Sequence, residues 1–374
     1  MRLVRCTKYE MNRKIGNRRI VVFGGGKAAH SMFEEDDSIC DLLDNIAFFV
    51  DNSLAGESIV IAGHTYKIYN PAKIMMEEEC AIIISSSMFM YDMYRELVQL
   101  GLSDRFECYI FPLIRINNIV YPTVEEHKKL LEKKLTIPKQ IHTFWFSGEN
   151  IPYSYKRCID SWRSVCPEYE IKVWTAENYD VYKNDFVSSA YKMGKWAFIA
   201  DYARLDVIYN YGGIYMDMDV ELLSNPHEIL CRKAVFSFDM NDNIDLAFFS
   251  SVPQNFLLKN LMELYTAQIM DSDKDARKYL QPKYIRKKLQ EYGIAMNGKL
   301  QWRDEMCFLP RTYFMPMDAT TYELNAKSQY TYGIHRFNTG WIEEKTTRSQ
   351  ISKNRELWRV FQDGDCNLNR SLIF

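Results

Sequence analysis

Two carboxylates stand two residues apart at the end of a short apolar run in the middle of this chain. Residues 214–216 are Ile, Tyr and Met, and Asp217 and Asp219 follow them. Alternate residues of a strand point to the same side, so both carboxylates can share one face. A carboxylate pair at a strand end suits a hard divalent cation, which can in turn hold a diphosphate. These residues therefore predict a site for a metal ion and a diphosphate.

The spacing alone is not specific, because the chain contains four Asp-x-Asp pairs. The other three, at 271/273, 273/275 and 363/365, lie in polar stretches typical of solvated loops. Only Asp217 and Asp219 end an apolar strand. That strand follows an expected amphipathic helix, from residue 195 to a glycine pair at 212–213, which is a common helix stop. The apolar strand and the helix before it, more than the spacing, therefore favour a functional role for Asp217 and Asp219.

The expected helix carries an acid and a base, Asp201 and Arg204, three residues apart and therefore on one face. The simplest interpretation is a surface ion pair of about 0.2–0.5 kcal/mol. The alternative is that both belong to the same site as the two carboxylates.

Together these residues form a recognisable motif, A-F-I-A-D-Y-A-R-L…Y-x-x-G-G-I-Y-x-D-x-D, over residues 197–219. It resembles glycosyltransferase family 32, whose members carry a sugar-binding region with a DXD motif and act in capsular polysaccharide synthesis. It is also similar, more distantly, to the glucosylating domains of large clostridial toxins. The resemblance implies an α/β fold with a nucleotide-diphospho-sugar transferase domain of the GT-A type. It further implies Mn²⁺ or Mg²⁺ and a nucleotide-sugar donor, with a UDP-sugar expected.

The resemblance also assigns roles to these residues. Asp219 would bind the metal directly, and Asp217 would reach the ribose, the sugar or the metal through water. Arg204 would contact the diphosphate or the sugar, Asp201 would accept hydrogen bonds from sugar hydroxyls, and Tyr215 would lie against the nucleotide-sugar. Family members retain the anomeric configuration, so we expect departure and attack on the same face of the sugar.

Two further segments complete the resemblance. Residues 137–148 are similar to the family's opening strand, which places Trp145 where an aromatic ring stacks on uracil, with His142 nearby. Ordinary sheet packing is the alternative for both. A late segment, 332–341, is similar to the segment that closes related sites, which makes His335 the third metal ligand and Trp341 a cover over the diphosphate and sugar. The family often has a second histidine where Arg336 stands here.

The first 115 or so residues alternate short apolar runs with helical segments, which is typical of a parallel, Rossmann-like sheet. Gly24-x-Gly26-x-x-Ala29 follows the first run and Asp51 the second, the layout of a dinucleotide fingerprint. This motif is weak, because any tight turn of such a unit needs glycines and Asp51 would equally cap a loop. The stretch is similar to small domains attached to polysaccharide-biosynthesis proteins. We expect a Rossmann-like domain over 1–120, a charged linker or helix over 121–136, the GT-A domain over 137–345 and a helical tail over 346–374.

Composition narrows the class of protein. With 47 basic and 49 acidic residues, the composition of the 374-residue chain gives no indication of general nucleic-acid binding. The nine scattered cysteines contain no C-x-x-C pair and suit a reducing compartment. The sequence shows neither a signal peptide nor an apolar run of about 18 residues. Because Golgi members carry such an anchor, we expect a bacterial, cytoplasmic enzyme.

The basic, aromatic segment 277–288 suggests peripheral contact with the inner face of the plasma membrane or with a lipid-diphosphate acceptor, although a solvated face is the simpler and preferred interpretation. Three functions therefore compete. The first is a metal-dependent retaining transferase that acts on a saccharide or lipid-linked saccharide in surface polysaccharide synthesis. The second is a toxin-like transferase that modifies a protein. The third is an inactive sensor that binds sugar nucleotides.

Overall fold

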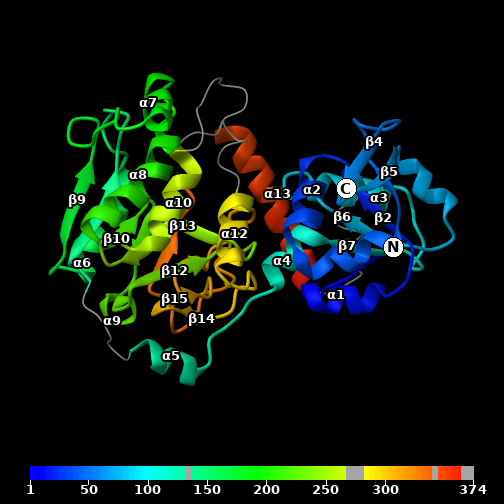
Figure 1. Ribbon diagram of the computed structural model, residues 1–374. Helices are drawn as coiled ribbons and strands as arrows, with labels where there is room; N and C mark the ends of the chain where they lie inside the picture. The colour runs from blue at the N-terminus through cyan, green and yellow to red at the C-terminus, as the bar shows by residue number, and fades with distance from the viewer. Residues whose placement is uncertain (132–136, 267–281, 339–343, 364–374) are drawn as a thin grey trace. The chain divides into compact units, whose positions relative to one another are not determined.

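The structure, a computed structural model, describes residues 1–131, 137–266, 282–338 and 344–363 (Figure 1). Within these ranges the chain forms two compact units. The first contains residues 1–119 together with 318–325 and the described part of 339–374, and the second contains 120–317 and 326–338. Among the described residues, no helix combines the length and apolar character that a membrane span requires. The chain thus leaves the first unit twice and returns to it twice.

The first unit is built on a seven-stranded sheet in the order β1-β7-β6-β2-β3-β5-β4. All neighbouring strands are parallel except β4, which pairs with β5 in an antiparallel hairpin at one edge. The four central strands are almost wholly buried and, apart from Glu107 of β7, carry no charged residue, as expected when helices cover both faces of a sheet. The strands are β1 (Arg2–Leu3), β2 (Ile20–Phe23), β3 (Ile46–Val50), β4 (Ser58–Ile61), β5 (His64–Tyr69), β6 (Ala81–Ile84) and β7 (Glu107–Ile110).

Helices flank this sheet, and the last described helix of the chain belongs to the same core (Figure 1). Leu357, Trp358, Val360 and Phe361 of α13 are buried with the sheet residues. The helical elements are α1 (Lys8–Ile15), α2 (Lys27–Glu35), η1 (Asp37–Asn45), η2 (Pro71–Met76), α3 (Met90–Gln99), α4 (Phe111–Asn117) and α13 (Glu344–Asp363).

The second unit has a mixed seven-stranded sheet in the order β14-β15-β12-β13-β10-β8-β9 and a separate two-stranded sheet, β11-β16. In the larger sheet β10 lies parallel to β8 and antiparallel to β13. The strands are β8 (Gln140–Phe144), β9 (Glu170–Trp174), β10 (Gly213–Met216), β11 (Val220–Leu222), β12 (Ala234–Phe238), β13 (Ile244–Ser251), β14 (Gln301–Arg303), β15 (Met306–Leu309) and β16 (Gly333–His335).

The helix α8 (Trp196–Tyr211) contacts β8, β10 and β13 on one side and the helices α7 (Asp185–Lys192) and α10 (Phe256–Thr266) on the other (Figure 1). Eight of its residues in the run from Ile199 to Ile208 are buried, including Arg204 and Asp206. The expected amphipathic character is therefore wrong for this helix. The reason is physical: a helix covered on both sides is apolar nearly all round. The remaining helices of this unit are α5 (Val124–Leu130), α6 (Tyr153–Val165), α9 (His227–Leu230) and α12 (Pro282–Glu291).

Two glycines between α8 and β10 let the chain reverse and enter the sheet. Gly212 and Gly213 both have positive φ, +69° and +96°. A Cβ at Gly213 would lie 2.6 Å from the carbonyl oxygen of Gln140 on β8, and one at Gly212 would lie 2.7 Å from Pro253 Cδ. Glycine thus permits the close parallel approach of β10 to β8, which sets the position of the residues that follow β10.

The structure confirms the apolar strand expected at 214–216, the helix expected from residue 195 to the glycine pair, and the alternation of strands and helices over the first 115 or so residues. The charged segment after residue 120 contains α5, begun by a capping box between Thr123 and Glu126. Residues 132–136 and 277–281, the first part of the basic segment 277–288, lie outside the described residues, whereas 282–288 form the first part of α12. The mixed α/β architecture agrees with the expected fold class.

Candidate metal centre

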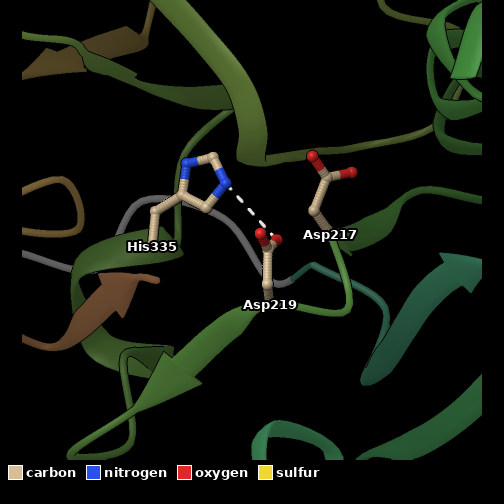
Figure 2. A group of neighbouring side chains, drawn as sticks. All are labelled: Asp217, Asp219 and His335. Carbon is tan, nitrogen blue, oxygen red and sulfur yellow. Dashed lines mark ion pairs between the residues drawn. The ribbon is translucent and has the colours of Figure 1, made fainter. Parts of the chain in front are cut away.

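Asp217, Asp219 and His335 form the one group of potential metal ligands found among the described residues. One ligand atom from each lies within 4.8 Å of the others. Asp217 and Asp219 follow β10, and His335 ends β16. Figure 2 shows the three side chains gathered there, with His335 facing Asp219. Oxygen and imidazole ligands in such a set suit Mn²⁺.

Strand pairing brings His335 to this place. β11 and β16 are antiparallel, and Val220 is paired with His335. The residue after His335 extends the pairing, because the Arg336 N–H donates to the Asp219 carbonyl at 2.8 Å. The Asn338 N–H then donates to Asp219 Oδ2 at 2.9 Å. The carboxylate of Asp219 is therefore oriented by the backbone of the late segment.

The imidazole of His335 lies between two carboxylates. Its Nε2 is 3.3 Å from Asp219 Oδ1, and its Nδ1 is 3.3 Å from Asp245 Oδ2. Burial opposes a charged imidazole, but the two carboxylates outweigh it and raise the pKa of His335 well above its ordinary value. Burial likewise opposes ionisation of Asp245, and the His335 contact more than compensates, so the pKa of Asp245 is lowered.

Arg204 links Asp201 to the ligand group through contacts with Asp217 and Tyr215. Its Nη2 is 2.8 Å from Asp201 Oδ1, its Nη1 is 3.7 Å from Asp217 Oδ2, and its guanidinium lies 5.0 Å from the centre of the Tyr215 ring. The Tyr215 hydroxyl donates to Asp217 Oδ1. The expected Asp201–Arg204 pair thus exists, but Arg204 is buried, Asp201 is partly buried, and the pair is joined to the site instead of lying in solvent.

Backbone contacts fix Arg204 further. Its Nη1 donates to the Leu246 carbonyl at 3.0 Å and its Nε to the Ala200 carbonyl at 3.1 Å. Burial raises the pKa of Asp201 to about 6, with Arg204 acting in the opposite direction. Burial also raises the pKa of Asp217, again against the charge of Arg204. The positive charge of the Arg204 guanidinium therefore favours the ionised forms of Asp201 and Asp217, which burial disfavours.

The aromatic residues expected at the donor site have different surroundings. His142 is fully buried, with Nε2 3.1 Å from the Gly212 carbonyl and Nδ1 3.1 Å from Trp174 Nε1. Both ring nitrogens therefore have protein partners, and burial lowers the pKa of His142 to about 4. Trp145 is half-buried and donates from Nε1 to the Glu149 carbonyl. Its ring lies 5.6 Å from that of Tyr155.

Arg336, the departure from the family pattern, turns away from the ligand group. Its Nε and Nη2 both donate to Glu221 Oε2 on the neighbouring strand. It therefore links β11 to the late segment instead of adding a ligand. Trp341, the expected cover of the site, lies outside the described residues.

The glycine motif belongs to the first unit. Gly24 and Gly26 follow β2, and Asp51 follows β3. The Asp51 carboxylate accepts hydrogen bonds from the backbone N–H groups of Gly25, Ser53 and Leu54. A Cβ at Gly24 would meet Ser85 Oγ at 2.5 Å, whereas one at Gly26 would have no neighbour within 4 Å. The Asp51 carboxylate thus binds backbone N–H groups of its own turn and of the glycine loop.

Three contributors to the site were not identified from the sequence. Asp245 contacts His335, Asn338 contacts Asp219, and the Tyr155 hydroxyl donates to the Asn338 carbonyl at 2.9 Å. Asp245 is the second residue of β13 and belongs to no recognised motif, and the contacts of the other two involve backbone atoms. None of the three has a local pattern that would mark it.

Comparison with known proteins places the site in context. Residues 152–236 match the family described as glycosyltransferase sugar-binding region containing DXD motif. This range holds Asp201, Arg204, Asp217 and Asp219, whereas Asp245 and His335 lie beyond it. The chain therefore carries a glycosyltransferase domain.

Two proteins of Schizosaccharomyces pombe are similar to part of the chain. Inositol phosphoceramide mannosyltransferase 1 is 30% identical over 132 residues, which are 32% of this chain and 40% of that protein. Inositol phosphoceramide mannosyltransferase 3 is 33% identical over 109 residues, 26% of this chain and 28% of that protein. The chain thus spans less than half the length of these relatives. The solved structure of PaToxG Glycosyltransferase aligns over 72% of this chain and 97% of that one, with 13% identity and a TM-score of 0.36, which does not establish a common fold.

Proposed function

We propose that this chain is a metal-dependent, retaining glycosyltransferase of GT-A type that moves a sugar from a nucleotide-sugar to a saccharide or lipid-linked saccharide. One observation carries the proposal: Asp217, Asp219 and His335 bring their ligand atoms within 4.8 Å of one another. The two carboxylates lie inside the region that matches the DXD glycosyltransferase family. A metal centre next to such a motif serves a donor with a diphosphate.

The residues present fit Mn²⁺ or Mg²⁺. Asp219 and His335 would hold the cation directly, because each turns a ligand atom toward the other at 3.3 Å. Asp217 would act through water or on the donor, since Tyr215 and Arg204 already engage its two oxygens. When bound there, a divalent cation would supply Lewis-acid stabilisation of the diphosphate leaving group.

The remaining residues bind and orient the donor. Asp201 offers carboxylate oxygens to sugar hydroxyls, and Arg204 fixes the position of Asp201 and supplies positive charge near the diphosphate. The exposed face of Trp145 beside Tyr155 would receive the nucleotide base. The acceptor's proton would pass to the leaving phosphate on the same face of the sugar, since no carboxylate of the chain is assigned as a covalent nucleophile.

For the donor we propose a UDP-sugar, and the names of the two yeast relatives add a mannosyl donor as the second choice. For the acceptor we propose a surface polysaccharide precursor, such as a capsule or exopolysaccharide unit, on the cytoplasmic side of a bacterial plasma membrane. The first unit would then serve as an accessory domain, because Asp51 is engaged with its own loop.

Calorimetric titration of nucleotide-sugars in the presence of Mn²⁺ tests where the donor binds. D219N is expected to lose donor binding, because it removes a charged metal ligand. Gly26→Trp is the matched probe of the glycine motif, since the space next to Gly26 is open and the larger side chain can be accommodated. Loss of binding in Gly26→Trp with retention in D219N would place the nucleotide in the first unit and contradict the proposal.

A further inference from the structure

A further carboxylate, that of Asp245, lies next to the metal centre. Asp245, at the start of β13, faces His335 from the side opposite Asp219. Its Oδ2 lies 3.3 Å from His335 Nδ1, while Asp219 Oδ1 lies 3.3 Å from Nε2. The imidazole is thus held at both nitrogens, and only the Nε2 side is next to Asp219.

Asp245 is itself held rigidly. Its Oδ1 accepts the backbone N–H of Ala247 at 2.8 Å. β13 pairs with both β10 and β12 in the middle of the larger sheet, and the Ala247 carbonyl accepts the Asp217 N–H at 2.8 Å. The same short stretch of backbone therefore positions Asp245 and the residue that follows β10.

We infer that Asp245 is a positioning residue for the metal centre, which fixes the orientation and the tautomer of His335. The inference rests on the proposed function. An Nδ1–H group donates to Asp245, so the lone pair of Nε2 is left to bind a metal ion next to Asp219. Histidine ligands of metals usually have such a partner at their second nitrogen, and loss of the partner lowers metal affinity by about ten- to a hundredfold.

The geometry predicts an unusual effect for D245N. The buried Ala247 N–H requires an acceptor, so the amide oxygen of the new side chain takes the place of Oδ1. Its NH₂ group then faces His335 Nδ1 and donates to it. This arrangement favours the Nε2–H tautomer, which has no lone pair for the metal. D245N keeps the size of the side chain but reverses the direction of the hydrogen bond, so that His335 Nδ1 accepts instead of donating.

Asp239 provides a matched control. It follows β12 near Asp245, and its Oδ1 accepts the N–H groups of both Asn241 and Asn243, at 2.7 and 2.9 Å. An asparagine keeps both bonds through its single amide oxygen. D239N therefore replaces one nearby carboxyl group without changing the partner of His335.

The test is pulsed electron paramagnetic resonance of the full chain with Mn²⁺, together with the Mn²⁺ dissociation constant. Wild type and D239N are expected to show ¹⁴N coupling from a bound imidazole. D245N is expected to lose it and to bind Mn²⁺ about ten- to a hundredfold more weakly. Unchanged coupling and affinity in D245N would overturn the inference alone, whereas absence of Mn²⁺ binding in wild type would overturn the proposed metal centre as well.

A second measurement needs no variant at the Asp245 position, in case D245N does not fold. Long-range ¹H–¹⁵N correlation of the Mg²⁺-loaded wild type, with His335 assigned by His335→Gln, reports which ring nitrogen carries the proton. A proton on Nδ1 supports the inference. A proton on Nε2 overturns it.

Discussion

His335 on β16 is the direct partner of Val220 on β11, the residue that follows Asp219. The position of His335 relative to Asp219 therefore depends on the register of these two short strands. A slip by one residue would turn the imidazole to the opposite face and separate it from Asp219. The contacts that fix this register are consequently part of the site.

The pair formed by Glu221 and Arg336 is the first such contact to test. Both side chains are about one quarter to one third exposed, so we expect a coupling free energy of about 0.2–1 kcal/mol from a double-mutant cycle of E221A and R336A. Either single substitution is also expected to weaken Mn²⁺ binding, because the register loosens.

The pair Asp160–Arg163 on α6 is the control for that cycle. Both side chains are about two thirds exposed, and neither contacts the ligand group. Its cycle should give less coupling and unchanged Mn²⁺ affinity. If the substitutions in both pairs weakened Mn²⁺ binding equally, this would contradict a specific role of the Glu221–Arg336 pair in fixing the register of β11 and β16.

Gly213→Ala tests the close approach of β10 and β8. The added methyl group would lie 2.6 Å from a backbone oxygen that cannot move away, and the residue would keep a positive φ. Strained backbone alone costs about 1–3 kcal/mol, so we expect a larger loss of unfolding free energy or no soluble protein. Gly148→Ala is the control, since its φ is also positive but nothing lies within 4 Å. Equal loss in the two variants, measured by chemical denaturation, would contradict the account.

The burial of Asp201 predicts a pH dependence of stability. Its pKa is raised from 3.8 to about 6, so between these values the folded state holds more proton than the unfolded state. The contribution of this group to the unfolding free energy therefore falls as pH rises through that window. In EDTA, the wild-type stability minus that of D201N should decrease from about pH 4 to about pH 6 and then level off. A difference that does not change with pH would show that Asp201 titrates normally.

The central carboxylates could be predicted from the sequence because their signal is local. An apolar strand that ends in Asp217 and Asp219 is visible in a few residues, and so is the glycine pair before it. His335 was predicted only through resemblance to a family. The contact between His335 and Asp219 depends on the pairing of β11 with β16, which are far apart in sequence and too short to be recognised from it.

Asp245 and the burial of Arg204 could not be predicted, for the same physical reason. Asp245 reaches the site through the pairing of β10 with β13, and no residue next to it in sequence indicates that pairing. Arg204 is buried because α7, α10 and the sheet enclose α8. Likewise, the sequence predicts a helical tail over 346–374, but the place of α13 in the core of the first unit depends on contacts with residues distant in sequence.

The most direct test of the central claim is release of nucleoside diphosphate from a panel of UDP- and GDP-sugars, with Mn²⁺ or with EDTA. We predict slow hydrolysis of one donor by wild type, abolished by EDTA. D219N should lower the rate by about a hundredfold or more, the scale seen when one charge-stabilising group is removed. Asp160→Asn, an exposed change on α6, should leave the rate unchanged. Turnover that persists in EDTA and in D219N, or no turnover and no Mn²⁺-dependent binding of any donor, would contradict a metal-dependent glycosyltransferase.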